Sequence, residues 1–322
     1  MAPAMGHAPS PEGAAAIPST AEAPRTLLIF SSWPERQLIA DSASFTSMSM
    51  LTNRKSLCED LRRLGLAPGQ IVMMHASIRS VGLPVGGPDE IHRAVEDAIA
   101  PSGTLMMFVG CQDGFDDIGR GDLSAAQEAE ILAHQPLFDF QHSRAARSFG
   151  ALAELFRSSP GTVCSCSVCG RMAARGHRAE WLISDHPWSY GFGKGSPLDK
   201  LCSEHGKVLL LGSSYDAVTL LHYAEHIAPF EGKRIARYKV PILRDEVRVW
   251  VDCEEFDTSS QGVHPDWPDN AFALIVTDFI ERFAGGPHCA QGIVGRAPSL
   301  LLDAASLVSH ALPIMRTWAT ES

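Results

Sequence analysis

The stretch from residue 57 to residue 109, LCEDLRRLGLAPGQIVMMHASIRSVGLPVGGPDEIHRAVEDAIAPSGTLMMFV, decides the fold class of this chain. Its first large apolar residues, Leu57, Leu61 and Leu64, recur at the spacing of one helix face. Two later segments are short apolar runs bounded by turn residues, which is typical of buried strands. The pattern therefore predicts helix, strand, helix and strand in succession, at 57–64, 71–75, 88–99 and 104–109. This alternation indicates a layered α/β domain.

The rest of the chain extends the same pattern. Further helices are expected at 147–156, 180–183, 216–227 and 272–283, strands at 207–211 and 295–302, and a hairpin of 240–243 with 247–251. We therefore expect one layered α/β/α domain with a mixed central sheet over residues 51–322. Residues 1–50 are expected to be disordered or poorly ordered, because their start is rich in Ala, Pro, Gly and Ser without apolar periodicity. They also lack the pattern of a signal peptide.

Composition excludes several classes of protein. The 322 residues are 45% hydrophobic and carry a formal net charge of -10, which argues against nucleic-acid binding and is compatible with a cationic substrate. No apolar stretch is long enough to span a membrane. Three of the eight cysteines lie in the run Cys164-Ser-Cys-Ser-Val-Cys169, but no second pair stands at a matching spacing, so we expect no metal. Reduced thiols suit a cytoplasmic protein.

Three motifs, taken together, identify a family. The first is His75-Ala-Ser77-Ile-Arg79-Ser-Val81-Gly82, which directly follows a predicted strand. The second runs from Ser184-Asp-His-Pro-Trp to Gly-Ser-Pro-Leu198, and the third is Thr219-Leu-Leu-His-Tyr-Ala-Glu-His226. In this order and spacing they resemble the aminoglycoside 3-N-acetyltransferase family, from about Thr52 to Leu312. One segment departs from the family pattern, because Cys-Ser-Cys-Ser-Val at 164–168 replaces Arg-Ser-x-(His or Asn)-Pro.

The resemblance implies direct acetyl transfer from acetyl-CoA to the 3-amino group of a 2-deoxystreptamine aminoglycoside, which confers antibiotic resistance. Such a reaction needs a base for the ammonium group, and the pKa of histidine suits this role. His186 is the candidate base, because it lies in the second motif at a Pro-bounded loop. Glu225, in the third motif, is the candidate carboxylate that orients the base. His222 precedes Glu225 by three residues and is expected to share its helix face.

The binding residues also follow from the resemblance. The acetyl-CoA path is expected to be lined by Ser77, Arg79, Val81, Gly82, Ser196 and Pro197. Arg79 is expected to pair with a phosphate. The cationic acceptor is expected to contact Asp113, Asp139, Asp185 and Asp257. The expected enzyme is a monomer or homodimer whose partner is the aminoglycoside rather than a nucleic acid or a membrane.

Three other interpretations stay open at this point. The first is an acyltransferase that acts on another amine, such as an amino sugar nucleotide or an amino-phosphonate. The second is a hydrolase, although Leu211-Gly-Ser-Ser-Tyr215 only vaguely matches a nucleophile elbow. The third is a binding homologue without activity, which the altered 164–168 segment favours.

Overall fold

The computed structural model describes residues 51–320 except 113–114, 116 and 259–262. Its first helix, α1 (Arg54–Leu64), follows from local sequence. At its N-terminus the Asn53 side chain accepts a hydrogen bond from the Ser56 N–H, and the Ser56 hydroxyl accepts one from the Asn53 N–H. Gly65 ends the helix at a φ of 116°. The apolar stripe of α1 is buried, as its spacing predicts.

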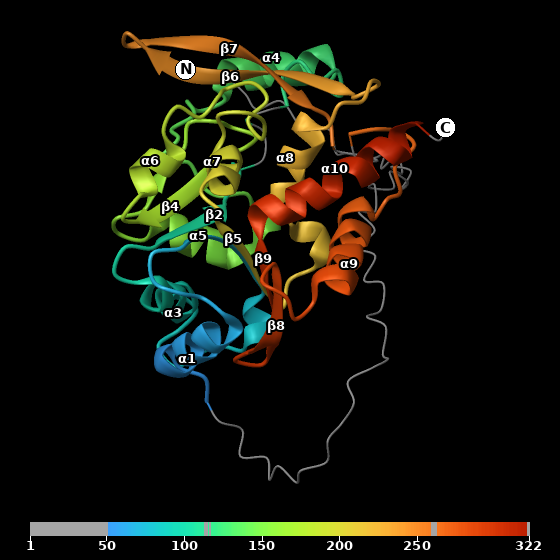
Figure 1. Ribbon diagram of the computed structural model, residues 1–322. Helices are drawn as coiled ribbons and strands as arrows, with labels where there is room; N and C mark the ends of the chain where they lie inside the picture. The colour runs from blue at the N-terminus through green and yellow to red at the C-terminus, as the bar shows by residue number, and fades with distance from the viewer. Residues whose placement is uncertain (1–50, 113–114, 116, 259–262, 321–322) are drawn as a thin grey trace, which may run out of the picture. The chain divides into compact units, whose positions relative to one another are not determined.

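A seven-stranded sheet forms the centre of the fold (Figure 1). Its strand order is β3-β4-β2-β1-β5-β9-β8. The strands are β1 (Ile71–Ala76), β2 (Thr104–Phe108), β3 (Val163–Cys164), β4 (Met172–Gly176), β5 (Lys207–Leu211), β8 (Cys289–Val294) and β9 (Ala297–Asp303). β1 runs parallel to both β2 and β5, and every other pairing is antiparallel. The expected mixed sheet is therefore confirmed.

Helices cover both faces of this sheet, which confirms the α/β/α layering. Alternate residues of β1 belong to opposite cores, since Ile71 and Met73 pack on one face while Val72 and Met74 pack on the other. The face of Val72 and Met74 is covered by α1, α3 (Asp89–Ile99) and α5 (Gly150–Ser158). The opposite face is covered by α6 (Ala179–Ile183), α7 (Pro197–Ser203), α8 (Leu220–Ile227), α9 (Ala271–Phe283) and α10 (Ala304–Thr320).

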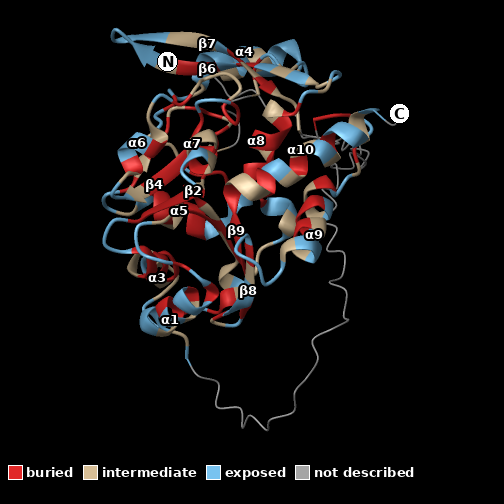
Figure 2. Cartoon of the chain, viewed as in Figure 1, coloured by how far each residue is buried: buried red, intermediate tan, exposed pale blue. Residues whose placement is uncertain are grey.

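The predicted hairpin is confirmed and is longer than expected. β6 (Ile235–Arg244) and β7 (Val247–Phe256) form a two-stranded ribbon of ten residues on each side. Its inner residues, among them Tyr238 and Val240, pack on Phe115, Phe138 and Val168. Figure 2 shows buried positions gathered in the sheet strands, while much of the ribbon is exposed.

Two predicted helices are broken. The helix expected at 147–156 is a 3₁₀ turn, η1 (Arg147–Phe149), followed by α5, and the one expected at 216–227 is η2 (Tyr215–Ala217) followed by α8. The strand expected at 295–302 begins at residue 297, because Gly295 makes the turn from β8 with a φ of 60°. The elements without a sequence expectation are β3, β4, β8, α2 (Ile78–Val81), α4 (Ala125–His134), α7 and α10. Across the part of the chain that is described, no helix combines the length and apolarity of a membrane span.

Candidate active site

A cavity of about 610 Å³ opens beyond the carboxyl ends of β1 and β2. Ligands in α/β sheets bind outside the carboxyl ends of parallel strands, so this cavity is the natural candidate site. β1 contributes His75 and Ala76 to its lining, and the end of β2 contributes Phe108 and Gly110. The remaining walls include Cys111, Arg120, Ser148, Phe149, Val168, Cys169, Phe192, Asp216, Thr219, His222 and the run Glu255–Thr258.

A histidine–carboxylate pair on α8 faces this cavity. His222 lines it, and the Nδ1 of His222 lies 2.6 Å from Oε2 of Glu225. The Glu225 side chain is only 1% exposed, whereas that of His222 is 24% exposed. Because a carboxylate can only accept, Nδ1 carries the proton and Nε2 keeps a lone pair. This is the arrangement of a general base that is oriented by a buried carboxylate.

Aromatic packing fixes the ring of His222. Its centroid lies 4.9 Å from that of Phe192 and 4.9 Å from that of Phe272, on two sides of the imidazole. The pair with Glu225 follows the i, i+3 spacing on one helix face, which was expected from the sequence. The sequence alone did not single out His222 as the base.

An acidic wall closes the cavity at the end of β7. Glu255 is 5% exposed, and its carboxylate accepts hydrogen bonds from the backbone N–H groups of Gly191 (2.7 Å) and Phe256 (2.9 Å). Asp257 lines the same cavity, as expected, and its N–H donates to the carbonyl of Arg234. Sequence reasoning missed Glu255, although its position two residues before Asp257 was a usable signal. Glu255 also lies 2.5 Å from the ring of His226, so Asp257 is the carboxylate of this wall that favours a cationic ligand.

His75 adds a neutral imidazole to the cavity. Burial lowers the pKa of His75 to about 4, so the ring is uncharged at neutral pH. Its carbonyl accepts a hydrogen bond from the Ser213 hydroxyl at 3.1 Å, which joins the end of β1 to the loop after β5. A neutral ring at this position does not repel a cationic ligand.

The structure places His186 elsewhere. Its side chain is buried at 2% exposure, and its Nε2 lies 2.6 Å from the carbonyl oxygen of Gly191, to which it must donate. The remaining lone pair is on Nδ1, which is buried without a partner among the described residues. Burial lowers the pKa of His186 to about 4, only partly offset by the bond to Gly191. His186 is also absent from the described lining of the cavity, where His222 is the histidine next to a buried carboxylate, so the role of His186 as the base stays a prediction.

The residues expected along the cosubstrate path divide into two groups. Ser77 caps α2 by accepting the Ser80 N–H, Arg79 is exposed, and Val81 is fully buried. Gly82, with a φ of 85°, ends α2 beside a second arginine, since a Cβ there would lie 2.7 Å from Nε of Arg296. None of these residues is among the described lining of the cavity.

The second group lies at the start of α7. Ser196 is fully buried and caps this helix by accepting the Asp199 N–H at 3.3 Å, and Pro197 occupies its first turn. This pair therefore builds the helix terminus and is absent from the described lining of the cavity. It has no exposed polar group to offer a ligand.

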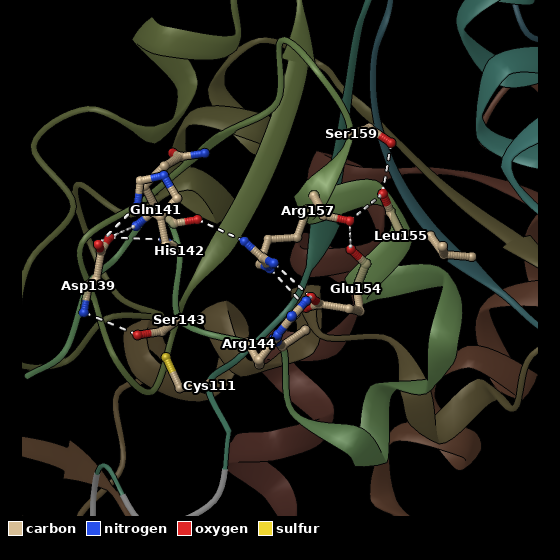
Figure 3. Close-up of polar contacts among 12 residues, drawn as sticks. Cys111, Asp139, Gln141, His142, Ser143, Arg144, Glu154, Leu155, Arg157 and Ser159 are labelled. Carbon is tan, nitrogen blue, oxygen red and sulfur yellow. Dashed lines mark hydrogen bonds and ion pairs between the residues drawn. The ribbon is translucent and has the colours of Figure 1, made fainter. Parts of the chain in front are cut away.

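Two of the other expected acidic residues, Asp139 and Asp185, are absent from the cavity lining that is described. Asp113 is outside the described residues. Asp185 is exposed at a φ of 52°. Figure 3 shows Asp139 turned toward its own loop, where it accepts from the N–H groups of Gln141 and His142 and pairs with the His142 ring. Burial raises the pKa of Asp139, but these hydrogen bonds outweigh it and leave the pKa low. Of the three that the structure describes, only Asp257 lines the cavity.

The segment that departs from the family pattern borders the cavity. Val168 and Cys169 belong to the lining, and the Cys166 thiol donates to the carbonyl of His186 at 3.2 Å. None of the eight cysteines, all of which lie in the described part of the chain, forms a disulfide. Among residues 51–320 outside the gaps, no three His, Cys, Asp or Glu side chains group as a metal site would require.

Comparisons with known proteins agree on one family. The family model described as aminoglycoside 3-N-acetyltransferase matches residues 73–316. An aminoglycoside N(3)-acetyltransferase III from Pseudomonas aeruginosa is 38% identical over 267 residues, covering 83% of this chain and 94% of that protein. An aminoglycoside N(3)-acetyltransferase VII from Streptomyces paromomycinus is 36% identical, with 81% and 91% covered.

Solved structures agree as well. AAC-IIIb in a binary complex with CoASH superposes with a TM-score of 0.77 at 38% identity, covering 83% of this chain and 97% of that chain. AAC-VIa bound to sisomicin superposes with a TM-score of 0.75 at 35% identity, covering 84% and 100%.

Proposed function

The chain belongs to the aminoglycoside 3-N-acetyltransferase family, and from this premise we propose that it transfers the acetyl group of acetyl-CoA directly to the 3-amino group of 2-deoxystreptamine aminoglycosides. In bacteria this reaction would confer resistance. The relative that was solved with CoASH supports the cosubstrate, and the relative that was solved with sisomicin supports the acceptor. The observation that carries the proposal is the His222–Glu225 pair at the cavity.

In this proposal His222 is the general base. Its Nε2 takes a proton from the acceptor ammonium group, and the resulting amine attacks the thioester carbonyl carbon. A carbon–nitrogen bond forms and the carbon–sulfur bond breaks. The proton held on Nε2 passes to the leaving thiolate, and the extra proton of the attacking nitrogen is lost to solvent, so the products are the amide, free CoA thiol and one proton. Glu225 stabilises the imidazolium that exists between the two proton transfers, because it is buried 2.6 Å from Nδ1.

The acidic wall binds the acceptor in this proposal. Glu255 and Asp257 lie on the cavity lining with His222, so an ammonium group that pairs with Asp257 is brought near the base. Asp139 and Asp185 have no support from the cavity lining that is described, and Asp113 lies outside the described residues. The contribution of Asp257 stays a prediction.

In this proposal, residues at α2 bind the phosphates of acetyl-CoA. Arg79 is exposed, and Arg296 lies against Gly82, so two guanidinium groups stand near the ends of this short helix. Such groups suit the phosphates of a nucleotide cosubstrate. Ser77 and Val81 shape this segment rather than offering charge, and Ser196 with Pro197 would contribute only through the terminus of α7.

A thiol-release assay with acetyl-CoA and a panel of aminoglycosides tests the proposal. We expect turnover with 2-deoxystreptamine compounds, and NMR of the product should show an acetyl group on the 3-amino nitrogen. Initial-rate patterns should intersect, since direct transfer requires a ternary complex. Parallel lines or an isolable acetyl-enzyme would refute direct transfer. Thiol release with an amino sugar nucleotide but with no aminoglycoside would favour the alternative acyltransferase.

A further inference from the structure

A second histidine–carboxylate pair lies behind the proposed base. Nε2 of His226, on α8, is 2.5 Å from Oε1 of Glu255, on β7. Nδ1 of His226 is 2.7 Å from the backbone carbonyl oxygen of His222. The side chains of the pair are 4% and 6% exposed, so the pair is shielded from water. It joins the helix that carries the base to the acidic wall of the cavity.

Donor and acceptor accounting fixes the charge of this pair. The His222 carbonyl can only accept, so Nδ1 of His226 carries a proton. Glu255 accepts two backbone N–H groups, from Gly191 and Phe256, and such bonds favour the ionised carboxylate. A carboxylate also can only accept, so Nε2 of His226 carries a proton as well. With Glu255 ionised, both ring nitrogens are donors, which is the imidazolium form of His226.

The surroundings of His226 hold this ion pair in one geometry. Lys233 donates from Nζ to the carbonyls of His226 and Ala228, at 3.0 and 2.8 Å. The ring of Phe256 stands edge-on to His226, with centroids 4.7 Å apart, and Tyr190 and Phe192 lie at 6.4 and 5.9 Å. The Tyr190 hydroxyl is bonded to Glu254 rather than to the pair. A buried ion pair of this kind costs desolvation free energy, and its known use is to specify one arrangement.

We propose that His226 is a positioning residue that, as an imidazolium, holds His222 and Glu255 at a fixed separation. This inference rests on the proposed function, because it concerns the distance between the base and the ammonium-binding wall. The link consists of two hydrogen bonds from one ring, one to the residue that carries the base and one to the wall. Loss of the bond to Glu255 leaves its carboxylate held by the Gly191 and Phe256 N–H groups alone, so the wall that Glu255 shares with Asp257 shifts and an acceptor bound there is no longer aligned with His222.

The protonation of His226 is measured without any turnover. Long-range ¹H–¹⁵N NMR of ¹⁵N-histidine-labelled protein at pH 7.5 identifies its signals as those missing from His226→Phe. We expect two protonated ring nitrogens for His226. One protonated and one unprotonated nitrogen would overturn the assignment of an imidazolium.

Three substitutions of His226 distinguish the effect of its hydrogen bond to Glu255 from that of its hydrogen bond to the His222 carbonyl. His226→Gln presents an amide N–H toward Glu255, His226→Asn reaches only the His222 carbonyl, and His226→Phe keeps the ring contacts with neither bond. We expect His226→Gln to keep kcat/KM for the acceptor within about fivefold of wild type. His226→Asn and His226→Phe should lose about tenfold to a hundredfold, because small misplacements near a reacting group have effects of this size. KM for acetyl-CoA should stay unchanged in all three.

A control uses another histidine–carboxylate ion pair, His310 with Asp278, whose Nε2 to Oδ2 distance is 2.8 Å. Asp278 is more exposed than Glu255 and also pairs with Arg282, and neither residue is among the described lining of the cavity. His310→Gln and His310→Phe should keep wild-type kinetic constants at comparable losses of Tm. The positioning role would be overturned if His226→Phe kept the wild-type kcat and acceptor KM. It would also be overturned if all three His226 variants lost kcat/KM equally and in proportion to their loss of Tm. If the wild type acetylates no aminoglycoside, the proposed function fails while the NMR result still stands.

Discussion

Replacing Glu225 by glutamine tests whether the negative charge of Glu225 stabilises the His222 imidazolium during turnover. The amide oxygen of glutamine still accepts the His222 Nδ1–H, so the ground-state tautomer is kept while the negative charge is lost. Charge centres about 4 Å apart interact with about 4 kcal/mol at an effective dielectric constant of 20. His222 is 24% exposed, and solvent on that side screens the interaction, so we take about half of this value. A loss of about 2 kcal/mol in the transition state lowers kcat about 30-fold.

The assay is thiol release at saturating acetyl-CoA and aminoglycoside, with Tm and the acetyl-CoA Kd measured on the same samples. We expect the reduced kcat with an unchanged Kd, because Glu225 contacts the base and is not among the residues assigned to the cosubstrate. A kcat within threefold of wild type would refute the reasoning that Glu225 stabilises an imidazolium during turnover.

Three further predictions address other parts of the account. His186→Ala should lower the free energy of unfolding by about 2–3 kcal/mol, because it leaves a cavity and an unpaired Gly191 carbonyl. Its kcat should stay within about threefold of the wild-type value. A large loss of kcat at wild-type stability would instead identify His186 as the base. Glu154 is paired with Arg157 and Arg144, and chiefly the bond with Arg157 lowers the pKa of Glu154 to about 2 (Figure 3). Its contribution to the free energy of unfolding is therefore full above the unfolded pKa near 4.5 and is lost as pH falls toward 2. Glu154→Gln should lower the free energy of unfolding by about 1–2 kcal/mol at pH 7 and by little at pH 2. Urea titrations at both pH values measure this, and equal losses at the two pH values would contradict it. A chain that starts near Met48 should keep its kcat, because the composition of residues 1–45 offers little apolar area to bury, and loss of soluble protein would show the opposite.

Local sequence patterns predicted the parallel centre of the fold. The runs that became β1, β2 and β5 are continuous and apolar, and they are buried on both faces of the sheet. The strands β3, β4 and β8 were missed because their sequence signal is weak. β4, for example, is Met-Ala-Ala-Arg-Gly, whose extended form depends on pairing with β2. The break between η2 and α8 was missed for a similar reason, since the apolar pattern runs across it.

Contacts between site residues on one helix could be predicted from the sequence, whereas contacts between residues on different elements could not. The i, i+3 spacing of His222 and Glu225 lies in one stretch of α8, so the sequence already showed that they share a face. The placement of His186 depends on a carbonyl five residues away in a folded loop and on the burial of that loop. The link of His226 to Glu255 joins residues 29 positions apart on a helix and a ribbon, which no local pattern reveals.

The most direct test of the central claim is the kcat of His222→Ala with an aminoglycoside that the wild type acetylates, at saturating acetyl-CoA. The account predicts a fall of about a hundredfold or more, because the reaction loses its general base, with the acetyl-CoA Kd unchanged. A kcat within a few-fold of wild type would contradict the assignment of His222 as the base.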